Sequence, residues 1–210
     1  MTILTPMMIH THNNPSRRWF LSAGAACTAL LAGQPVFALT TAEAEGLIDK
    51  LVVEINRVIS SGRSEQQMYG DFEKIFAKYA DVPTIARSTL GPDARSASAA
   101  QMRAYVDAFE GYIARKYGKR FREFIGGKIE VNAARQLKSF YEVRTTAILK
   151  GEAPFAVTFL VSDRSGRLLF FDLLIEGISL LKSEKQEIGA MLDRRKGDFD
   201  AMIVDLKRAG

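Results

Sequence analysis

The spacing of apolar residues changes twice along this chain, and the order of these changes limits its possible folds more than any single motif does. From residue 40 to residue 124 apolar side chains recur every three or four positions, which is the period of a helix buried on one side. From residue 128 to residue 175 they alternate with polar ones, as in a strand with one buried face. Helical spacing then returns. This order predicts a single α+β domain with helices packed against one face of an antiparallel sheet.

Capping and turn residues divide these regions into elements. Helices are predicted over 40–61, 64–79, 81–90, 98–124 (with a kink at Gly118), 183–197 and 198–206. Four begin with a capping box, and the pairs are Thr40 with Glu43, Ser64 with Gln67, Ser98 with Gln101 and Ser183 with Gln186. Asp81 and Asp198 begin the other two. The predicted strands are 129–133, 141–149, 155–161 and 169–175, which makes a four-stranded sheet whose odd-numbered residues face the core.

The first 38 residues read as an export leader. Arg17 and Arg18 precede an uncharged run of 13 residues, Phe20 to Ala32, and residues 35–38 form a small-x-small cleavage site. A membrane span needs about 20 apolar residues, so this run is too short to be one. The pattern predicts a twin-arginine signal over 1–38 that is removed, and a single domain over 39–210 that is soluble in the periplasm.

Loss of that leader would remove the residues best suited to catalysis. His10, His12 and Cys27 all lie within it, so the mature chain contains no His and no Cys. This excludes Ser-His and Cys-His nucleophiles and His-based zinc sites, and we expect no metal and no cofactor. Loss of Arg17 and Arg18 reduces the 29 basic residues to 27, against 24 acidic ones, so the mature net charge is about +3. That excess is too small to predict a nucleic-acid partner.

Two groups of charged residues remain as candidates. Asp172 and Glu176, with Asp81, could serve a periplasmic hydrolase or isomerase, but four residues of strand separate the first two by about 13 Å. A solvated or hydrogen-bonded pair at the end of the last strand is therefore the favoured interpretation of Asp172 and Glu176. A basic cluster could steer an anionic partner or simply be the solvated face of a helix; it comprises Arg115, Lys116, Lys119, Arg120 and Arg122.

The many inward-facing aromatic and aliphatic residues fit two kinds of interior. A filled core would suit an adaptor that binds only protein, whereas a hollow one would hold an apolar ligand. Periodicity does not distinguish the two.

Two motifs resemble a known family. Residues 172–180, DLLIEGISL, are similar to the D-x-x-x-E-G-x-S-L signature of the periplasmic phospholipid-binding MlaC (toluene-tolerance) family. Residues 79–91, YADVPTIARSTLG, resemble its D-x-x-x-I-A-R-x-x-L-G segment. The helix of 101–124 and the closing helix with Phe199, Ile203 and Leu206 also match, so the resemblance spans the whole mature chain in order.

The resemblance implies a carrier and not an enzyme. Such a protein transports phospholipid between an inner-membrane ABC transporter and an outer-membrane complex, and so maintains outer-membrane lipid asymmetry; another amphiphile such as a hopanoid remains an alternative cargo. The expected acyl-chain cavity is lined by Ile85, Leu90, Val106, Phe109, Ile113, Tyr117, Phe121, Val143, Ala147, Val157, Phe159, Phe171, Leu173 and Ile175. The chain departs from the family where residues 168–169 and 92–94 lack its usual Trp and where 184–188 replace its usual Tyr-Arg-x-x-Phe.

Overall fold

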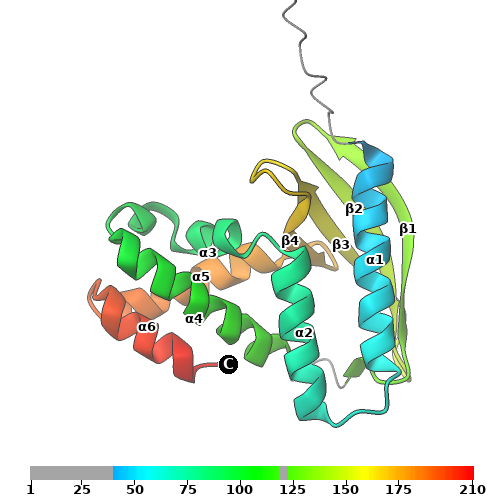
Figure 1. Ribbon diagram of the computed structural model, residues 1–210, viewed down its shortest axis with the longest axis horizontal. Coiled ribbons are helices and arrows are strands. Elements are labelled where there is room, and N and C mark those ends of the chain that lie inside the picture. The colour runs from blue at the N-terminus through cyan, green and yellow to red at the C-terminus, as the bar shows by residue number, and fades with distance from the viewer. Residues whose placement is uncertain (1–39, 119–122) are drawn as a thin grey trace, which may run out of the picture. The chain divides into compact units, whose positions relative to one another are not determined.

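The computed structural model describes residues 40–118 and 123–210, which belong to one compact unit (Figure 1). The described helices are α1 (Thr41–Ile59), α2 (Glu65–Tyr79), α3 (Val82–Leu90), the 3-10 helix η1 (Gly91–Arg95), α4 (Ala99–Gly118), α5 (Leu180–Arg194) and α6 (Phe199–Arg208). The strands are β1 (Lys128–Leu137), β2 (Phe140–Ile148), β3 (Phe155–Ser162), β4 (Leu169–Ile175) and β5 (Ile178–Ser179). The predicted α+β class is confirmed, and the predicted leader lies outside the described residues.

The strands form one antiparallel sheet in the order β1-β2-β3-β4-β5. Four strands were predicted; the fifth, β5, has two residues and pairs only with the end of β4. Figure 1 shows α1 lying lengthwise over β1 and β2, with α2 beside it, while α3 to α6 gather on the far side of α2. The interior therefore lies between the sheet, α1, α2 and the second group of helices.

Three predicted capping boxes are present. In the first, the Glu43 amide donates to the Thr40 hydroxyl at 3.2 Å and the Glu43 carboxylate accepts from the Thr40 amide at 2.8 Å. Ser64 with Gln67 and Ser98 with Gln101 form the same reciprocal pairs at the starts of α2 and α4. Local sequence thus places these helix starts correctly, because each box satisfies backbone donors within its own first turn.

The predicted start of α5 at Ser183 is wrong. The helix begins at Leu180, and its N-cap is Ser179, whose hydroxyl accepts from the Lys182 amide at 3.1 Å. The same hydroxyl donates to the Asp172 carboxylate at 2.6 Å. Because Asp172 belongs to β4, a contact between elements and not the local box fixes where this helix begins.

The predicted helix 98–124 is also corrected. The described part of α4 ends at Gly118, residues 119–122 lie outside the described part, and Phe124 belongs to a short 3-10 turn. Gly118 is buried where α4 approaches α2, and a Cβ added there would lie 2.9 Å from the Tyr69 ring. The glycine permits a close approach of two helices at a place where we predicted a kink.

Two β-bulges change the predicted strand faces. In β1 the register shifts between Val131 and Ala133, so that Ala133, predicted to face inward, is exposed and Ala134 pairs with the buried Val143. A bulge inserts one extra residue, which moves every later side chain to the other face.

A second bulge displaces the middle of β4. Phe170 pairs with Val161 and Leu173 with Phe159, so Phe170 takes the inward position predicted for Phe171. The rings of Phe170 and Phe159 pack edge to face at 5.5 Å between centroids. Odd-numbered residues of β2 and β3 do face the core, as predicted.

Candidate functional site

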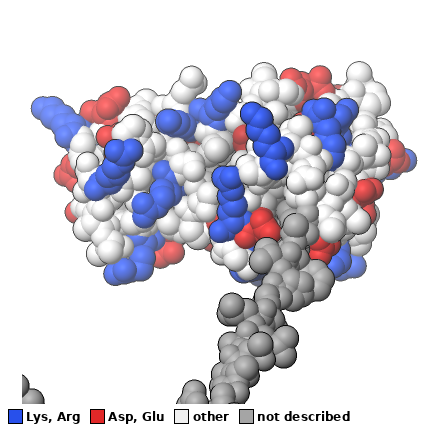
Figure 2. Space-filling view, turned by 90° about the horizontal axis from the view of Figure 1, so that it is seen from above, with Lys and Arg blue, Asp and Glu red and all other residues white. Residues whose placement is uncertain are grey.

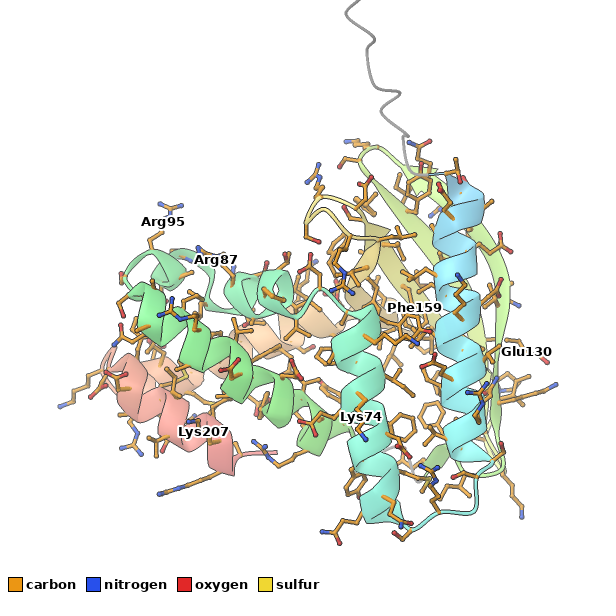
Figure 3. The ribbon with its side chains drawn as sticks, in the orientation of Figure 1. Lys74, Arg87, Arg95, Glu130, Phe159 and Lys207 are labelled. Atoms are coloured by element: carbon orange, nitrogen blue, oxygen red, sulfur yellow. The ribbon has the colours of Figure 1, made fainter. Side chains whose placement is uncertain are left out.

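An apolar cavity of about 160 Å³, here called the main cavity, lies between the sheet, α1, α2 and the end of α4. Figure 3 shows Phe159, one of its wall residues, projecting from the sheet into the space beside α2. The wall consists of Leu51, Ile55, Phe72, Ile75, Phe76, Ile113, Ala114, Tyr117, Phe124, Ile129, Phe155, Val157, Phe159, Phe170, Leu173, Ile175 and Leu180. Among these side chains only Tyr117 carries a polar atom, so the cavity suits a hydrocarbon guest.

A second hollow of about 20 Å³, here called the side cavity, adjoins the first. It shares Phe76, Ile113, Phe170, Leu173 and Leu180 with the main cavity. Its remaining wall is Ile85, Phe109, Phe171, Asp172, Leu181 and Glu184. Only apolar side chains therefore separate the two hollows, while two carboxylates stand on the wall of the smaller one.

Nine of the fourteen predicted site residues line one or both hollows. Those on the main cavity are Ile113, Tyr117, Val157, Phe159, Leu173 and Ile175, and those on the side cavity are Ile85, Phe109, Ile113, Phe171 and Leu173. Phe121 lies outside the described residues. Leu90, Val106, Val143 and Ala147 line neither hollow.

Ala147 shows that a residue on the buried face of a strand need not line the cavity. Ala147 is fully buried on the inward face of β2, and its cross-strand partners Ile129 and Phe155 both line the main cavity. Its methyl group is shorter than either neighbour, so the larger side chains form the wall in front of it. Period two identifies the buried face of a strand but not which of its residues reach a hollow.

Sequence reasoning also missed wall residues. Leu51, Ile55, Phe72 and Ile75 lie in the predicted helices 40–61 and 64–79 but were not assigned to the site. Phe170 was missed because of the bulge in β4, although its ring lies 6.1 Å from Phe76 and completes the wall. The apolar stripes of α1 and α2 were the available signal for the first four; a bulge leaves no comparable signal.

The three carboxylates considered for acid-base chemistry each accept a hydrogen bond from a backbone amide. Asp172 is buried and accepts from the Ser179 hydroxyl at 2.6 Å and from the Leu181 amide at 3.0 Å. Glu176 occupies a left-handed turn with φ of 49° and accepts from the Ala156 amide. Asp81 caps α3 through the Thr84 amide at 3.2 Å. The signature of 172–180 thus builds the β4–β5 turn and the start of α5, and these three residues have structural roles.

A different carboxylate, Glu184, is the most buried charged side chain described, at 1% exposure. It accepts from the Tyr112 hydroxyl at 2.9 Å, from the Lys116 ammonium at 2.8 Å and from the Tyr117 hydroxyl. Lys116 also donates to the half-exposed Glu187. We call these five residues the Glu184 cluster; it ties α5 to α4 beside the cavities.

The electrostatics of this cluster keep it intact near neutral pH. Burial and the neighbouring Glu184 charge raise the pKa of Tyr112 far above its usual range, so its hydroxyl stays a donor. Burial alone would lower the pKa of Lys116, but its hydrogen bonds to Glu184 and Glu187 outweigh burial and raise it. The bond from Lys116 lowers the pKa of Glu187. Tyr112 and Lys116 therefore remain donors, and Glu187 remains an acceptor, near neutral pH.

The predicted basic cluster has mixed roles. Arg115 donates to the Ala209 and Leu206 carbonyls at 2.8 and 2.9 Å and so caps the end of α6, and Lys116 belongs to the Glu184 cluster. Lys119, Arg120 and Arg122 lie outside the described residues. Figure 2 shows Lys and Arg side chains separated by uncharged surface across one face, with Asp and Glu mostly toward its edges.

The described residues contain neither a metal-ligating cluster nor a membrane-spanning helix. Over 40–118 and 123–210 no group of three or more His, Cys, Asp and Glu side chains is arranged to hold a metal ion. Within the same ranges no helix has the length and hydropathy needed to cross a membrane.

Comparisons with known proteins agree with one another. A family model described as MlaC protein matches residues 46–208. A phospholipid-binding protein from Ralstonia solanacearum, solved in complex with a phospholipid, has a similar fold with a TM-score of 0.68. The two chains share 18% sequence identity, and the match covers 79% of this chain and 95% of the other. The whole fold, and not a fragment of it, is therefore shared.

Proposed function

The chain belongs to the MlaC family, and from that premise we propose that it is a carrier that binds a phospholipid by its acyl chains. The family is one of lipid-binding carriers and not of enzymes. The observation that supports the proposal most is the main cavity, which lies between sheet and helices and has an almost wholly apolar wall. The related Ralstonia solanacearum protein holds a phospholipid within the same fold.

The chemistry of such a cargo fits this wall. Acyl chains need a dry apolar surface and no reactive group, and residues such as Phe159, Val157 and Leu173 provide it. A headgroup that stays in water avoids the cost of burying its phosphate charge, which amounts to several kcal/mol or more. We therefore place the chains in the main cavity and the headgroup outside it.

The cavity must enlarge to take this cargo. A hollow of about 150 Å³ admits a guest the size of benzene, and the main cavity has about 160 Å³. Two acyl chains of ordinary length need several times that volume, so the wall must move apart on binding. A wall that can close again after release avoids the free-energy cost of a large empty hollow.

Release then requires assistance. At about 0.8 kcal/mol per buried methylene, two sixteen-carbon chains would supply over 20 kcal/mol, which is near the limit for non-covalent binding. Spontaneous dissociation would be very slow. We therefore propose that the protein exchanges lipid with an inner-membrane ABC transporter complex and an outer-membrane lipoprotein complex, in the periplasm, to which the twin-arginine leader of residues 1–38 would direct it.

Delipidation and reloading test this function. Phospholipid that binds only the native state raises the melting temperature by mass action, so stripped protein should melt at a lower temperature and recover when lipid is returned. A stripped protein whose melting temperature does not respond to phospholipid would contradict the proposal and favour a filled-core adaptor.

A further inference from the structure

The position of the side cavity indicates where the end of a bound acyl chain would lie. The main and side cavities share five apolar wall residues, among them Phe76, Phe170 and Ile113. Side chains in a packed interior change rotamer, and a shift of one shared aromatic ring would join the two hollows. A chain that fills the main cavity can therefore extend toward the side cavity.

The wall of the side cavity that is not shared with the main cavity differs from the shared wall in that it includes two buried carboxylates. Glu184, at 1% exposure, and Asp172, at 8%, both contribute to it. Asp172 is held by the Ser179 hydroxyl and the Leu181 amide. Glu184 is held by three donors from α4, the side chains of Tyr112, Lys116 and Tyr117. Each carboxylate is therefore fixed by hydrogen bonds and not by packing alone.

Hydrocarbon cannot replace these hydrogen bonds. Moving Glu184 aside would separate a buried charge from its partners, which is far less favourable than turning an apolar side chain. The Glu184 cluster also joins α4 to α5, so these helices cannot separate there while the cluster is intact. Expansion on lipid binding can displace the shared apolar wall but must stop at Glu184.

We propose that Glu184, held by Tyr112, Lys116 and Tyr117, is a fixed end stop that limits the length of the acyl chain that the cavity accepts. The inference rests on the proposed function, since it concerns the chains of a bound phospholipid. It assigns Glu184 a role in chain-length specificity, with Ile85, which lines only the side cavity, standing beside the last methyl group.

Competition among lipids that differ only in chain length tests the end stop. Stripped protein is exposed to an equimolar mixture of dilauroyl, dipalmitoyl and diarachidoyl phosphatidylcholine, and bound species are counted by native mass spectrometry. Ile85→Phe fills the side cavity and should lower the share of the longer lipids, about fourfold for each methylene that can no longer be buried, while dilauroyl binding is unchanged. Glu184→Ala removes the stop and should raise the share of diarachidoyl lipid.

Control variants distinguish the proposed end stop from a general loss of protein structure. Gln186→Ala changes an exposed residue of α5 that lies outside the Glu184 cluster and lines neither hollow, so it should leave the three shares as in the unaltered protein. If Glu184→Ala does not fold, the opposite shift in Ile85→Phe still decides the matter. Unchanged shares in Ile85→Phe would overturn the end stop while the carrier function stands. An unaltered protein that binds none of the three lipids would contradict the proposed function and the end stop with it.

Discussion

At the scale of single residues, position on a strand face decides what a side chain can do. Val157 and Thr158 are neighbours on β3, but Val157 is buried at 6% exposure and lines the main cavity, whereas Thr158 lies on the opposite face of the sheet. Adjacent residues thus form a matched pair, one facing the proposed cargo and one not. The same alternation explains why a single bulge in β4 gives Phe170 the inward position that was expected of Phe171.

Val157→Trp should displace phospholipid and leave the protein folded. An indole added to the hollow occupies the space of the acyl chains, whereas the same change in a filled core would destabilise the fold by about 1–3 kcal/mol. Thr158→Trp, on the other face, should keep its lipid. Bound phosphorus per protein and a melting curve for both variants give the result. Full lipid content in Val157→Trp would show that the cargo lies elsewhere.

At the scale of elements, capping motifs in the sequence correctly predicted those helix starts that depend on hydrogen bonds within a single turn. The helix starts at Thr40, Ser64 and Ser98 were correct because each capping box closes within one turn. The bulge at Asn132 and the start of α5 were not predicted, because both depend on contacts between different elements and not on the residues of a single turn. The candidate site shows the same division: the apolar faces were predicted, but which residues reach a hollow depends on tertiary packing.

Ser179→Ala tests the corrected start of α5. The change removes the N-cap and one hydrogen bond to Asp172, so it should lower the free energy of unfolding by about 0.5–2 kcal/mol. Ser183→Ala, at the predicted but incorrect start, should change it by less than about 0.5 kcal/mol. Urea denaturation of both variants measures these values. A larger loss in Ser183→Ala than in Ser179→Ala would contradict the assigned helix start.

At the scale of the whole molecule, the fold explains how a chain of this size can carry a large apolar guest. The sheet supplies one wall of the main cavity, and α1, α2 and the end of α4 supply the others, so the space for a guest lies between separate elements.

Export should depend on Arg17 and Arg18. If residues 1–38 are a twin-arginine leader, replacing both residues with Lys should leave uncleaved precursor in the cytoplasm, because the export machinery reads the arginine pair. Fractionation followed by immunoblotting measures the outcome. Normal accumulation of the shorter mature form in the periplasm would contradict this assignment.

Native mass spectrometry of the protein purified from its own periplasm, without added lipid, tests the central claim most directly. The carrier account predicts an added mass that corresponds to one phospholipid per chain and that, on dissociation, yields an intact lipid with both acyl esters unbroken. Protein that carries no phospholipid, or that releases only cleaved products, would contradict it.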